Sequence, residues 1–274
     1  VENILPEGSS INVSILYPEL SDKSSHFKQR FAKVDQQINQ DIKNGFPGAV
    51  LMVIKDGDIV KHSAYGYSRK FADGGELLTS PTKMTVDTMF DIASNTKMFA
   101  TNLALMKLVS EGKLDVSKRI TQYLPQYRGA GREMRLVKDI LTHNAGYSPQ
   151  VKFHTRDNAL GEQFYSQNTE KTKQLLLTKV PFEVGRLSKR MYSDTDYMLL
   201  GLLIERITGM SLGSYVEHEI YHPLNLNQTV YNPLLKGFSK NQFAATEIQG
   251  NTRGGRIDFD NVRQYVLQGE VHDE

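Results

Sequence analysis

The first clear pattern along the chain is an amphipathic helix over residues 24–43. Apolar side chains recur there every three or four positions, with Gln, Asp and Lys between them, which places them on one face of a helix. We expect Ser24 or Ser25 to cap the first turn and Asn44-Gly45 to end the helix. Residues 1–22 show no such period and are predicted to form an extended N-terminal arm.

A β-hairpin is predicted over residues 49–67. Two apolar runs flank Lys55-Asp56-Gly57-Asp58, and an Asp-Gly pair between β-rich runs is a strong signal for a two-residue turn. The first run, Ala49–Ile54, is apolar throughout, so we expect both of its faces to be covered. Residues 68–88 carry Gly, Pro, Thr and Asp and are predicted to be a loop. Because a lone hairpin is marginally stable, we expect further strands near the C-terminus or beyond Glu274.

Most of the remaining chain is predicted to be helical. The clearest helix covers residues 95–110, with Gly112 just past its end, and it is apolar enough that we expect it to be buried on most faces. Residues 235–274 are rich in Asn, Gln, Gly and Arg and have one strand-like piece, 264–267. The other predicted helices cover residues 138–141, 173–177, 195–207 and 212–220.

These patterns predict an α+β protein in three parts. The first is the arm of residues 1–22, the second is an α/β part over 23–93 with an incomplete sheet, and the third is a mainly helical domain with an irregular tail over 94–274.

Composition excludes some classes of function. The chain has 33 Lys and Arg against 31 Asp and Glu, without a basic stripe, so we expect no nucleic-acid partner. The absence of cysteine excludes disulfides, thiolate zinc sites and a cysteine nucleophile. The seven histidines show no metal-binding spacing, so we expect no metal and no cofactor. No apolar run reaches the 18 or more residues that a membrane-spanning helix requires.

A Ser-x-x-Lys pattern, which can hold a serine nucleophile and its base, occurs four times. In a helix, residues three apart share a face, so the lysine can meet the serine. The lysine must also be poorly solvated to accept a proton. A serine in the first turn gains from the positive end of the helix dipole. The four pairs are Ser25/Lys28, Ser80/Lys83, Ser94/Lys97 and Ser110/Lys113.

Context favours Ser94 and Lys97. The lysine of the first pair lies among solvated polar residues, the second pair contains Pro81 in the predicted loop, and the fourth straddles Gly112 at the carbonyl end of a helix. Ser94 opens a nearly all-apolar helix that would carry Lys97 into a poorly solvated site. The alternative is a serine that caps a core helix and a lysine whose stem is buried while its amine reaches water.

A second constellation supports the catalytic interpretation. Tyr192-Ser193-Asp194 stands at the entry to the predicted helix 195–207. We expect the Tyr192 phenol to relay protons and Ser193 to pass them on. Asp194 is expected to be the N-cap of the helix, a role that is compatible with the catalytic one.

Three segments resemble the serine β-lactamase and penicillin-binding protein superfamily. They are FDIASNTKMFATNLALMKLVSEGKLDVSKRITQYLP, VKDILTHNAGY and MYSDTDYMLLGLLIERITGMSLGSYVEHEIYHPLNL. The order of motifs over residues 45–235 is similar to the class-C-like subgroup, which holds D-Ala-D-Ala carboxypeptidases, esterases and β-lactamases. The tail GEVHDE is similar to a stretch common in cell-wall hydrolases of this kind.

The resemblance implies a fold and a set of roles. The fold would be an antiparallel sheet flanked by helices plus a mainly helical domain, with the active site between them. Ser94 would be the acylated nucleophile and its N–H half of the oxyanion hole, Lys97 the activating base, and Tyr192 the proton shuttle. Ser193, Asp194 and Asn95 would contact the substrate. His143 lies in a family segment that we interpret as structural, as a hydrogen-bonded packing residue.

Two departures from the family pattern stand out. Asp194 occupies a position that is usually Asn, and a carboxylate only accepts hydrogen bonds and favours the charged form of Lys97. We expect this to shift substrate preference. The third family motif, Lys or His followed by Ser or Thr and then Gly, does not occur after residue 194. We therefore expect the C-terminal sheet strands to be missing from this sequence, and with them one oxyanion donor.

The leading functional hypothesis is a serine acyl-transfer hydrolase of the cell envelope, a D-Ala-D-Ala carboxypeptidase that penicillin acylates at Ser94. A β-lactamase or esterase with the same chemistry is the first alternative, and a non-catalytic peptidoglycan-binding relative is the second. The expected partners are peptidoglycan stem peptides or β-lactams, with possible peripheral membrane association. The resemblance alone implies a location in the periplasm or cell envelope.

Overall fold

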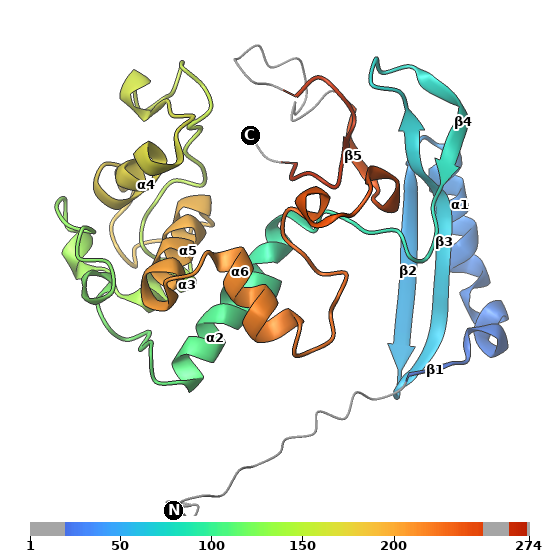
Figure 1. Cartoon of the computed structure of the whole chain (residues 1–274), viewed down its shortest axis with the longest axis horizontal. Coiled ribbons are helices and arrows are strands. Elements are labelled where there is room, and N and C mark those ends of the chain that lie inside the picture. Colours follow the sequence, from blue (N-terminus) through green and yellow to red (C-terminus); the bar gives the residue numbers. More distant parts are fainter. Residues whose placement is uncertain (1–19, 249–262, 273–274) are drawn as a thin grey trace, which may run out of the picture. The chain divides into compact units, whose positions relative to one another are not determined.

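The computed structural model describes residues 20–248 and 263–272 (Figure 1). These residues form two compact units. The first comprises the described residues up to Lys70 together with Ser80–Thr88, and the second comprises Phe71–Thr79 together with the described residues from Met89 onward. Of the predicted arm, residues 1–19 lie outside the described residues. The expected boundary at residues 93 and 94 stays a prediction.

The predicted amphipathic helix is present in the first unit, but its start differs from the expectation. A 3₁₀ segment, Ser24–Phe31, leads into helix α1, Ala32–Lys43. Neither Ser24 nor Ser25 is the N-cap, because Lys23 occupies that position without a side-chain hydrogen bond. Instead, the Asp22 carboxylate accepts from the Ser24 N–H at 2.9 Å. An acidic side chain two residues earlier thus satisfies a free N–H group of the first turn.

The predicted hairpin is confirmed. Strands β2, Gly48–Lys55, and β3, Asp58–Phe71, pair antiparallel, with Lys55 opposite Asp58 across the turn. Asp56 and Gly57 both have positive φ, of 52° and 82°, as a type I′ turn requires. Helix α1 is tied to β3 through the Asp35 carboxylate, which accepts from Lys61 Nζ at 2.6 Å and from the Tyr65 hydroxyl.

Two strands were missed by the sequence pattern. The predicted loop over residues 68–88 is wrong, because β3 continues to Phe71 and strand β4, Leu77–Lys83, pairs with it. Strand β1, Ser21–Asp22, runs parallel to β3. The described sheet therefore has four strands in place of a lone hairpin. Pro81 obscured β4, because proline is compatible with a strand only where no ladder N–H is needed.

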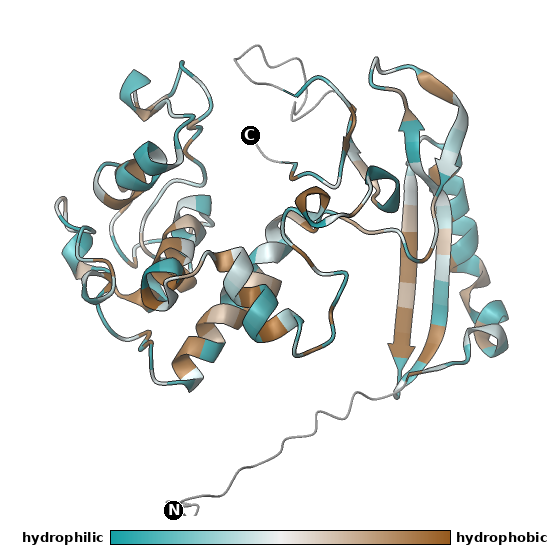
Figure 2. Ribbon diagram, in the orientation of Figure 1, coloured by the Kyte–Doolittle hydropathy of each residue, from teal (hydrophilic) through white to brown (hydrophobic). Residues whose placement is uncertain are grey.

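The expectation that β2 is covered on both faces is also wrong for the described residues. Met52 and Ile54 remain 47% and 48% exposed. Figure 2 shows most of β2 as hydrophobic, and these two side chains lie on one of its faces because alternate residues of a strand point the same way.

The second unit is mainly helical, as predicted. A 3₁₀ turn, Ala93–Asn95, and a π-helical segment, Lys97–Asn102, lead into α2, Leu103–Ser110. Another π-helical segment, Glu217–Tyr221, extends the last helix. The other α-helices are α3, Val137–Leu141; α4, Thr169–Thr178; α5, Asp194–Thr208; and α6, Leu212–Val216.

Two details of these helices differ from the expectation. Ser193 is the N-cap of α5, and Asp194 is its first helical residue. The segment over residues 95–110 is less buried than its composition suggested: Ala104, Leu105 and Leu108 are buried, whereas Met98, Phe99, Met106 and Val109 are exposed. The hydrophobic residues therefore encircle the helix, while only one face has neighbours among the described residues.

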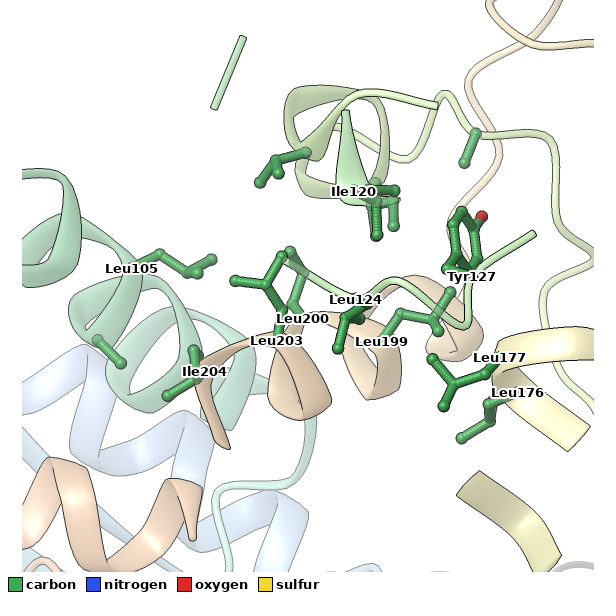
Figure 3. Close-up of a cluster of buried hydrophobic side chains, with 14 of the residues drawn as sticks. Leu105, Ile120, Leu124, Tyr127, Leu176, Leu177, Leu199, Leu200, Leu203 and Ile204 are labelled. Atoms are coloured by element: carbon green, nitrogen blue, oxygen red, sulfur yellow. The ribbon is translucent and has the colours of Figure 1, made fainter. Parts of the chain in front are cut away.

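The core of the second unit extends along α5, with side chains of α2 at one end and of α4 at the other (Figure 3). The figure shows side chains from these helices pointing toward Ile120, Leu124 and Tyr127 from the connecting segments. Tyr127 and Tyr147 are fully buried and satisfy each other through a hydrogen bond of 2.7 Å between their hydroxyls. This core fixes the first turn of α5, which carries part of the site described next.

The tail forms a small second sheet. Strand β5, Ala245–Glu247, pairs antiparallel with β6, Leu267–Gln268. The predicted strand 264–267 overlaps β6 at Leu267 only. In the described part of the chain, no helix has both the length and the apolar character needed to cross a membrane.

Candidate active site

Ser94 lies in a short turn, and the residue before it is held by a hydrogen bond to the Asp91 side chain. The preceding residue, Ala93, has φ of +45°, a conformation that an alanine adopts only when the surroundings enforce it. The enforcing group is the Asp91 carboxylate, whose Oδ1 accepts from the Ala93 N–H at 2.7 Å. Its Oδ2 accepts from the His272 N–H at 2.8 Å. One carboxylate thus joins the tail to the residue before Ser94.

The hydroxyl of Ser94 lies between a lysine and a tyrosine. Lys97 Nζ donates to Ser94 Oγ at 3.1 Å, and Tyr192 Oη donates to the same oxygen at 2.8 Å. Lys97 reaches Ser94 because the two residues are three positions apart along one turn, as predicted from their spacing. Two donors that converge on Oγ are the arrangement that stabilises negative charge on this atom.

Lys97 is partly enclosed and paired. Its side chain is 17% exposed, and its Nζ lies 2.8 Å from Oδ1 of Asp194, which is 39% exposed. Burial lowers the pKa of Lys97, but hydrogen bonds and charges from Asp194 and Tyr192 outweigh this effect, so the net pKa lies above its usual value. The expectation that a carboxylate at position 194 favours the charged lysine is thus confirmed in direction.

The Tyr192 ring contacts a lysine and a histidine. Lys97 Nζ lies 4.9 Å from the centroid of the Tyr192 ring, a cation–π contact. His143 also contacts Tyr192, with 4.8 Å between the ring centroids, and contacts Tyr197 at 5.2 Å. These contacts restrict where the phenol oxygen can lie relative to Ser94.

His143 is hydrogen-bonded into the interior, as the sequence interpretation expected. Its Nδ1 lies 3.0 Å from Asp196 Oδ2 and 3.2 Å from the Ser193 N–H. Burial raises the pKa of Asp196 to about 6, although the hydrogen bond and charge of His143 act in the opposite direction. His143 is nevertheless more than a packing residue, because it also lines the cavity beside Ser94.

The cavity beside Ser94 has a volume of about 410 Å³. Of the predicted site residues, Ser94, Lys97, Tyr192 and Asn95 line it. Ser193 does not, because it is fully buried and its Oγ makes no hydrogen bond to the described residues. This geometry gives no support to the expected substrate contact and proton transfer by Ser193. The other lining residues are Ile92, Ala93, Met98, His143 and Tyr197.

Sequence reasoning missed three residues of the site. Asp196 and Tyr197 follow the Tyr192-Ser193-Asp194 motif, and Asp91 precedes Ser94. A signal for Asp196 existed, since an acidic residue at a core-facing position of an apolar helix needs a partner. Asp91 carried no comparable signal, because its partner His272 lies 181 residues away.

No metal centre is found in the described segments, which contain no group of three or more His, Asp or Glu placed to hold an ion. The groups that the site offers are the Ser94 hydroxyl, the Lys97 amine, the Tyr192 phenol and the His143 imidazole.

Asp194 gives a first testable prediction. In Asp194→Asn, Lys97 loses its anionic partner, so the pKa of Lys97 should fall and more of the lysine should be neutral at pH 7. If Lys97 is the base, the rate of acylation by a penicillin should rise at neutral pH, and its pH profile should move down by on the order of one pH unit. Stopped-flow acylation between pH 6 and 10 measures this, and an unmoved profile would contradict it.

The family model described as Beta-lactamase matches residues 27–267. Among curated relatives, the chain is 49% identical over 273 residues to a protein of Bacillus subtilis (strain 168) named N-acetylmuramyl-L-alanine amidase. That match covers 97% of this chain and 60% of the relative. A putative D-alanyl-D-alanine carboxypeptidase of Salmonella gallinarum is 44% identical over 271 residues, covering 95% of this chain and 62% of the relative.

Solved structures show the same fold at lower identity. A class C β-lactamase is 20% identical with a TM-score of 0.62, over 89% of this chain and 61% of that one. FmtA from Staphylococcus aureus is 24% identical with a TM-score of 0.58, over 84% of this chain and 59% of that one. These likenesses confirm the expected β-lactamase-like α+β fold.

The chain spans about 60% of the length of these curated relatives. The family model nevertheless covers the Ser94 turn, the Lys97 and Tyr192 side chains around it, and the α-helical core that carries them. With this site inside the matched range, the chain belongs to the Beta-lactamase family.

Proposed function

We propose that this chain carries the acylating site of a serine hydrolase that acts on amide bonds of peptidoglycan. The observation that carries the proposal is the position of Ser94 Oγ, 3.1 Å from Lys97 Nζ and 2.8 Å from Tyr192 Oη at the edge of a cavity. A serine hydroxyl is a weak nucleophile alone, and an adjacent base and proton shuttle are what it needs to attack a carbonyl.

In the proposed reaction, Ser94 Oγ attacks the carbonyl carbon of the amide. Its proton passes to neutral Lys97, and Tyr192 delivers a proton to the departing nitrogen as the C–N bond breaks. The product is an ester on Ser94, which water then hydrolyses with the same groups in reversed roles. Lys97 and Tyr192 both donate to Ser94 Oγ, and these two hydrogen bonds stabilise the negative charge that develops on this oxygen as it loses its proton.

For the substrate, we propose the D-Ala-D-Ala end of a stem peptide. The Salmonella relatives named putative D-alanyl-D-alanine carboxypeptidases, at 44% identity, support this proposal. So do the motifs over residues 45–235, by which we further propose that the chain is related to penicillin-binding protein 4B, a low-molecular-weight envelope protein. By the same relationship we propose a location in the periplasm or cell envelope.

A second candidate is cleavage of the amide between the lactyl group of muramic acid and L-alanine. The Bacillus subtilis relative named N-acetylmuramyl-L-alanine amidase, at 49% identity, favours it. Both reactions use the same acyl-enzyme chemistry and differ in the leaving group, which is D-alanine in one and the amino end of a peptide in the other. Asp194 does not line the cavity, so its carboxylate acts on either reaction through Lys97, with which it pairs at 2.8 Å.

The test is to offer both substrates to the full-length protein. A pentapeptide ending in D-Ala-D-Ala and a muramyl-L-alanyl peptide are incubated separately, and the products are identified by mass spectrometry. Release of free D-alanine supports the carboxypeptidase, whereas release of a peptide with a free L-alanine amine supports the amidase. A fluorescent penicillin is incubated in parallel. No product from either substrate and no adduct with penicillin would contradict the hydrolase and favour a binding protein, while rapid turnover of penicillin would favour a β-lactamase.

A further inference from the structure

The two ring nitrogens of His143 face different surroundings. Nδ1 points into the interior, where it lies 3.0 Å from Asp196 Oδ2 and accepts from the Ser193 N–H at 3.2 Å. The ring also lines the cavity beside Ser94, and no hydrogen bond joins Nε2 to the described residues. The imidazole therefore connects a buried carboxyl group to the cavity that holds the nucleophile.

Asp196 is placed to share a proton with this ring. Its side chain is 1% exposed, and its other oxygen, Oδ1, makes no hydrogen bond to the described residues. A carboxylate with one unsatisfied oxygen in the interior is unfavourable, so the protonated form is favoured. When Nδ1 accepts from the Ser193 N–H it carries no proton of its own, and the proton between the two groups then lies on Asp196.

Loss of one proton from this pair rearranges it. While Asp196 is protonated and donates to Nδ1, the ring proton is on Nε2, the nitrogen that does not contact Asp196. After a proton leaves the pair, the remaining one lies on Nδ1 and donates to the Asp196 carboxylate, and Nε2 becomes an acceptor. One deprotonation thus adds a negative charge next to the ring that contacts Tyr192, and it changes Nε2 from a hydrogen-bond donor to an acceptor.

The ring is held firmly while this happens. His143 has φ of +57°, an uncommon backbone conformation for a residue other than glycine, and such residues concentrate at functional sites. Its ring contacts Tyr192 at 4.8 Å and Tyr197 at 5.2 Å between centroids.

We propose that His143 and Asp196 form a proton-sharing pair that positions Tyr192 beside Ser94 and makes acylation depend on the ionisation of the pair. His143 is thus a positioning residue, and Asp196 acts through it. The proposal deepens the proposed function and rests on it.

The direction of the dependence follows from charge. During attack, the proton of Ser94 moves onto the group formed by Lys97 and Tyr192, which becomes more positive. A negative charge on the buried pair favours this transfer, so acylation should be faster once the pair has lost its proton. The other titratable groups next to the pair are Tyr192 and Tyr197, which contact His143, and Tyr147, which lies near enough to Asp196 to feel its charge. Lys97 lies over the Tyr192 and Tyr197 rings and pairs with Asp194.

The first experiment measures acylation of the full-length protein by a fluorescent penicillin between pH 5 and 9. As the pH is lowered, the acylation rate of the wild type should fall more steeply below about pH 6 than above it, because the pair regains its proton in that range. Asp196→Asn imitates the protonated carboxyl, so it should lack this extra slope and be slower by about tenfold at pH 7.5, while matching the wild type at pH 5. Glu205→Gln is the matched control and should keep the wild-type profile, because this partly exposed carboxylate of the same helix pairs with Lys173 and does not line the cavity beside Ser94.

The second experiment needs no activity. The ¹⁵N shifts of the His143 ring, assigned by comparison with His143→Asn, report which nitrogen carries the proton. Asparagine tolerates the positive φ, so this variant should fold. A change from Nε2–H to Nδ1–H near pH 6, absent in Asp196→Asn, supports the pair. An imidazole that titrates the same way in both proteins overturns the proposal.

The two experiments separate the possible failures. If the wild type forms no adduct while the ring shifts behave as expected, the proposed function fails and the proton-sharing pair stands. If the wild type is acylated but Asp196→Asn keeps the steep acidic slope, the pair has no role in acylation.

Discussion

Alanine at position 94 is expected to abolish the covalent adduct with penicillin and to reduce hydrolysis of the peptide substrate to background. No other hydroxyl lies within hydrogen-bonding distance of both Lys97 and Tyr192 in the described site, so no substitute nucleophile is available. Removal of a catalytic nucleophile typically costs on the order of 10⁶ in rate. Intact-mass measurement after incubation with penicillin reads the result directly.

The protein should remain folded when Ser94 is changed. The side chain is exposed and contributes little packing, so the free energy of unfolding should change by no more than about 0.5 kcal/mol. Ser110→Ala is the matched control, because Ser110 belongs to another Ser-x-x-Lys pair and lies at the end of α2. Its adduct should form at the wild-type rate. An adduct of undiminished yield in Ser94→Ala would refute the assignment of the nucleophile.

Arginine at position 97 should also eliminate acylation, by a factor of about 10³ or more, without unfolding the protein. The guanidinium keeps the positive charge and can still pair with Asp194, but it does not give up a proton near neutral pH. The variant therefore removes proton transfer while it preserves charge. Single-turnover acylation measured at pH 8 tests the expectation.

Lys113→Arg provides the control, since this exposed lysine pairs with Glu111 away from the cavity. If Lys97→Arg were acylated as fast as this control, Lys97 would have only an electrostatic role, and Tyr192 would be left as the acceptor of the Ser94 proton. The outcome therefore distinguishes two ways of activating the same hydroxyl.

The reactive pair could be predicted from sequence because its determinants are local. Lys97 meets Ser94 through the spacing of one turn, and Tyr192 stands at the start of a helix with a clear apolar period. The apolar helix that follows Ser94 distinguished this pair from three others, even though parts of that helix are exposed. Local spacing and periodicity thus favoured one of the four pairs, and the family resemblance supplied the catalytic roles proposed for it.

The features that sequence did not predict depend on distant partners. Strand β4 contains Pro81, so the strand propensity of its sequence is low. Pairing with β3 stabilises it, and local sequence carries no information about that pairing. The pairing of His143 with Asp196 joins residues 53 positions apart. A polar residue within an apolar helix indicates that a partner exists, but it does not identify that partner.

The double contact of Asp91 has a consequence for synthesis of the protein. Its carboxylate bonds to Ala93, beside Ser94, and to His272, which is 181 residues further along. At about 5–20 residues per second, translation separates these two partners by roughly 10–40 seconds. Throughout that interval, the Asp91 carboxylate of the nascent chain can bond to Ala93 but not yet to His272, so the turn before Ser94 is fully anchored only after the ribosome has passed His272.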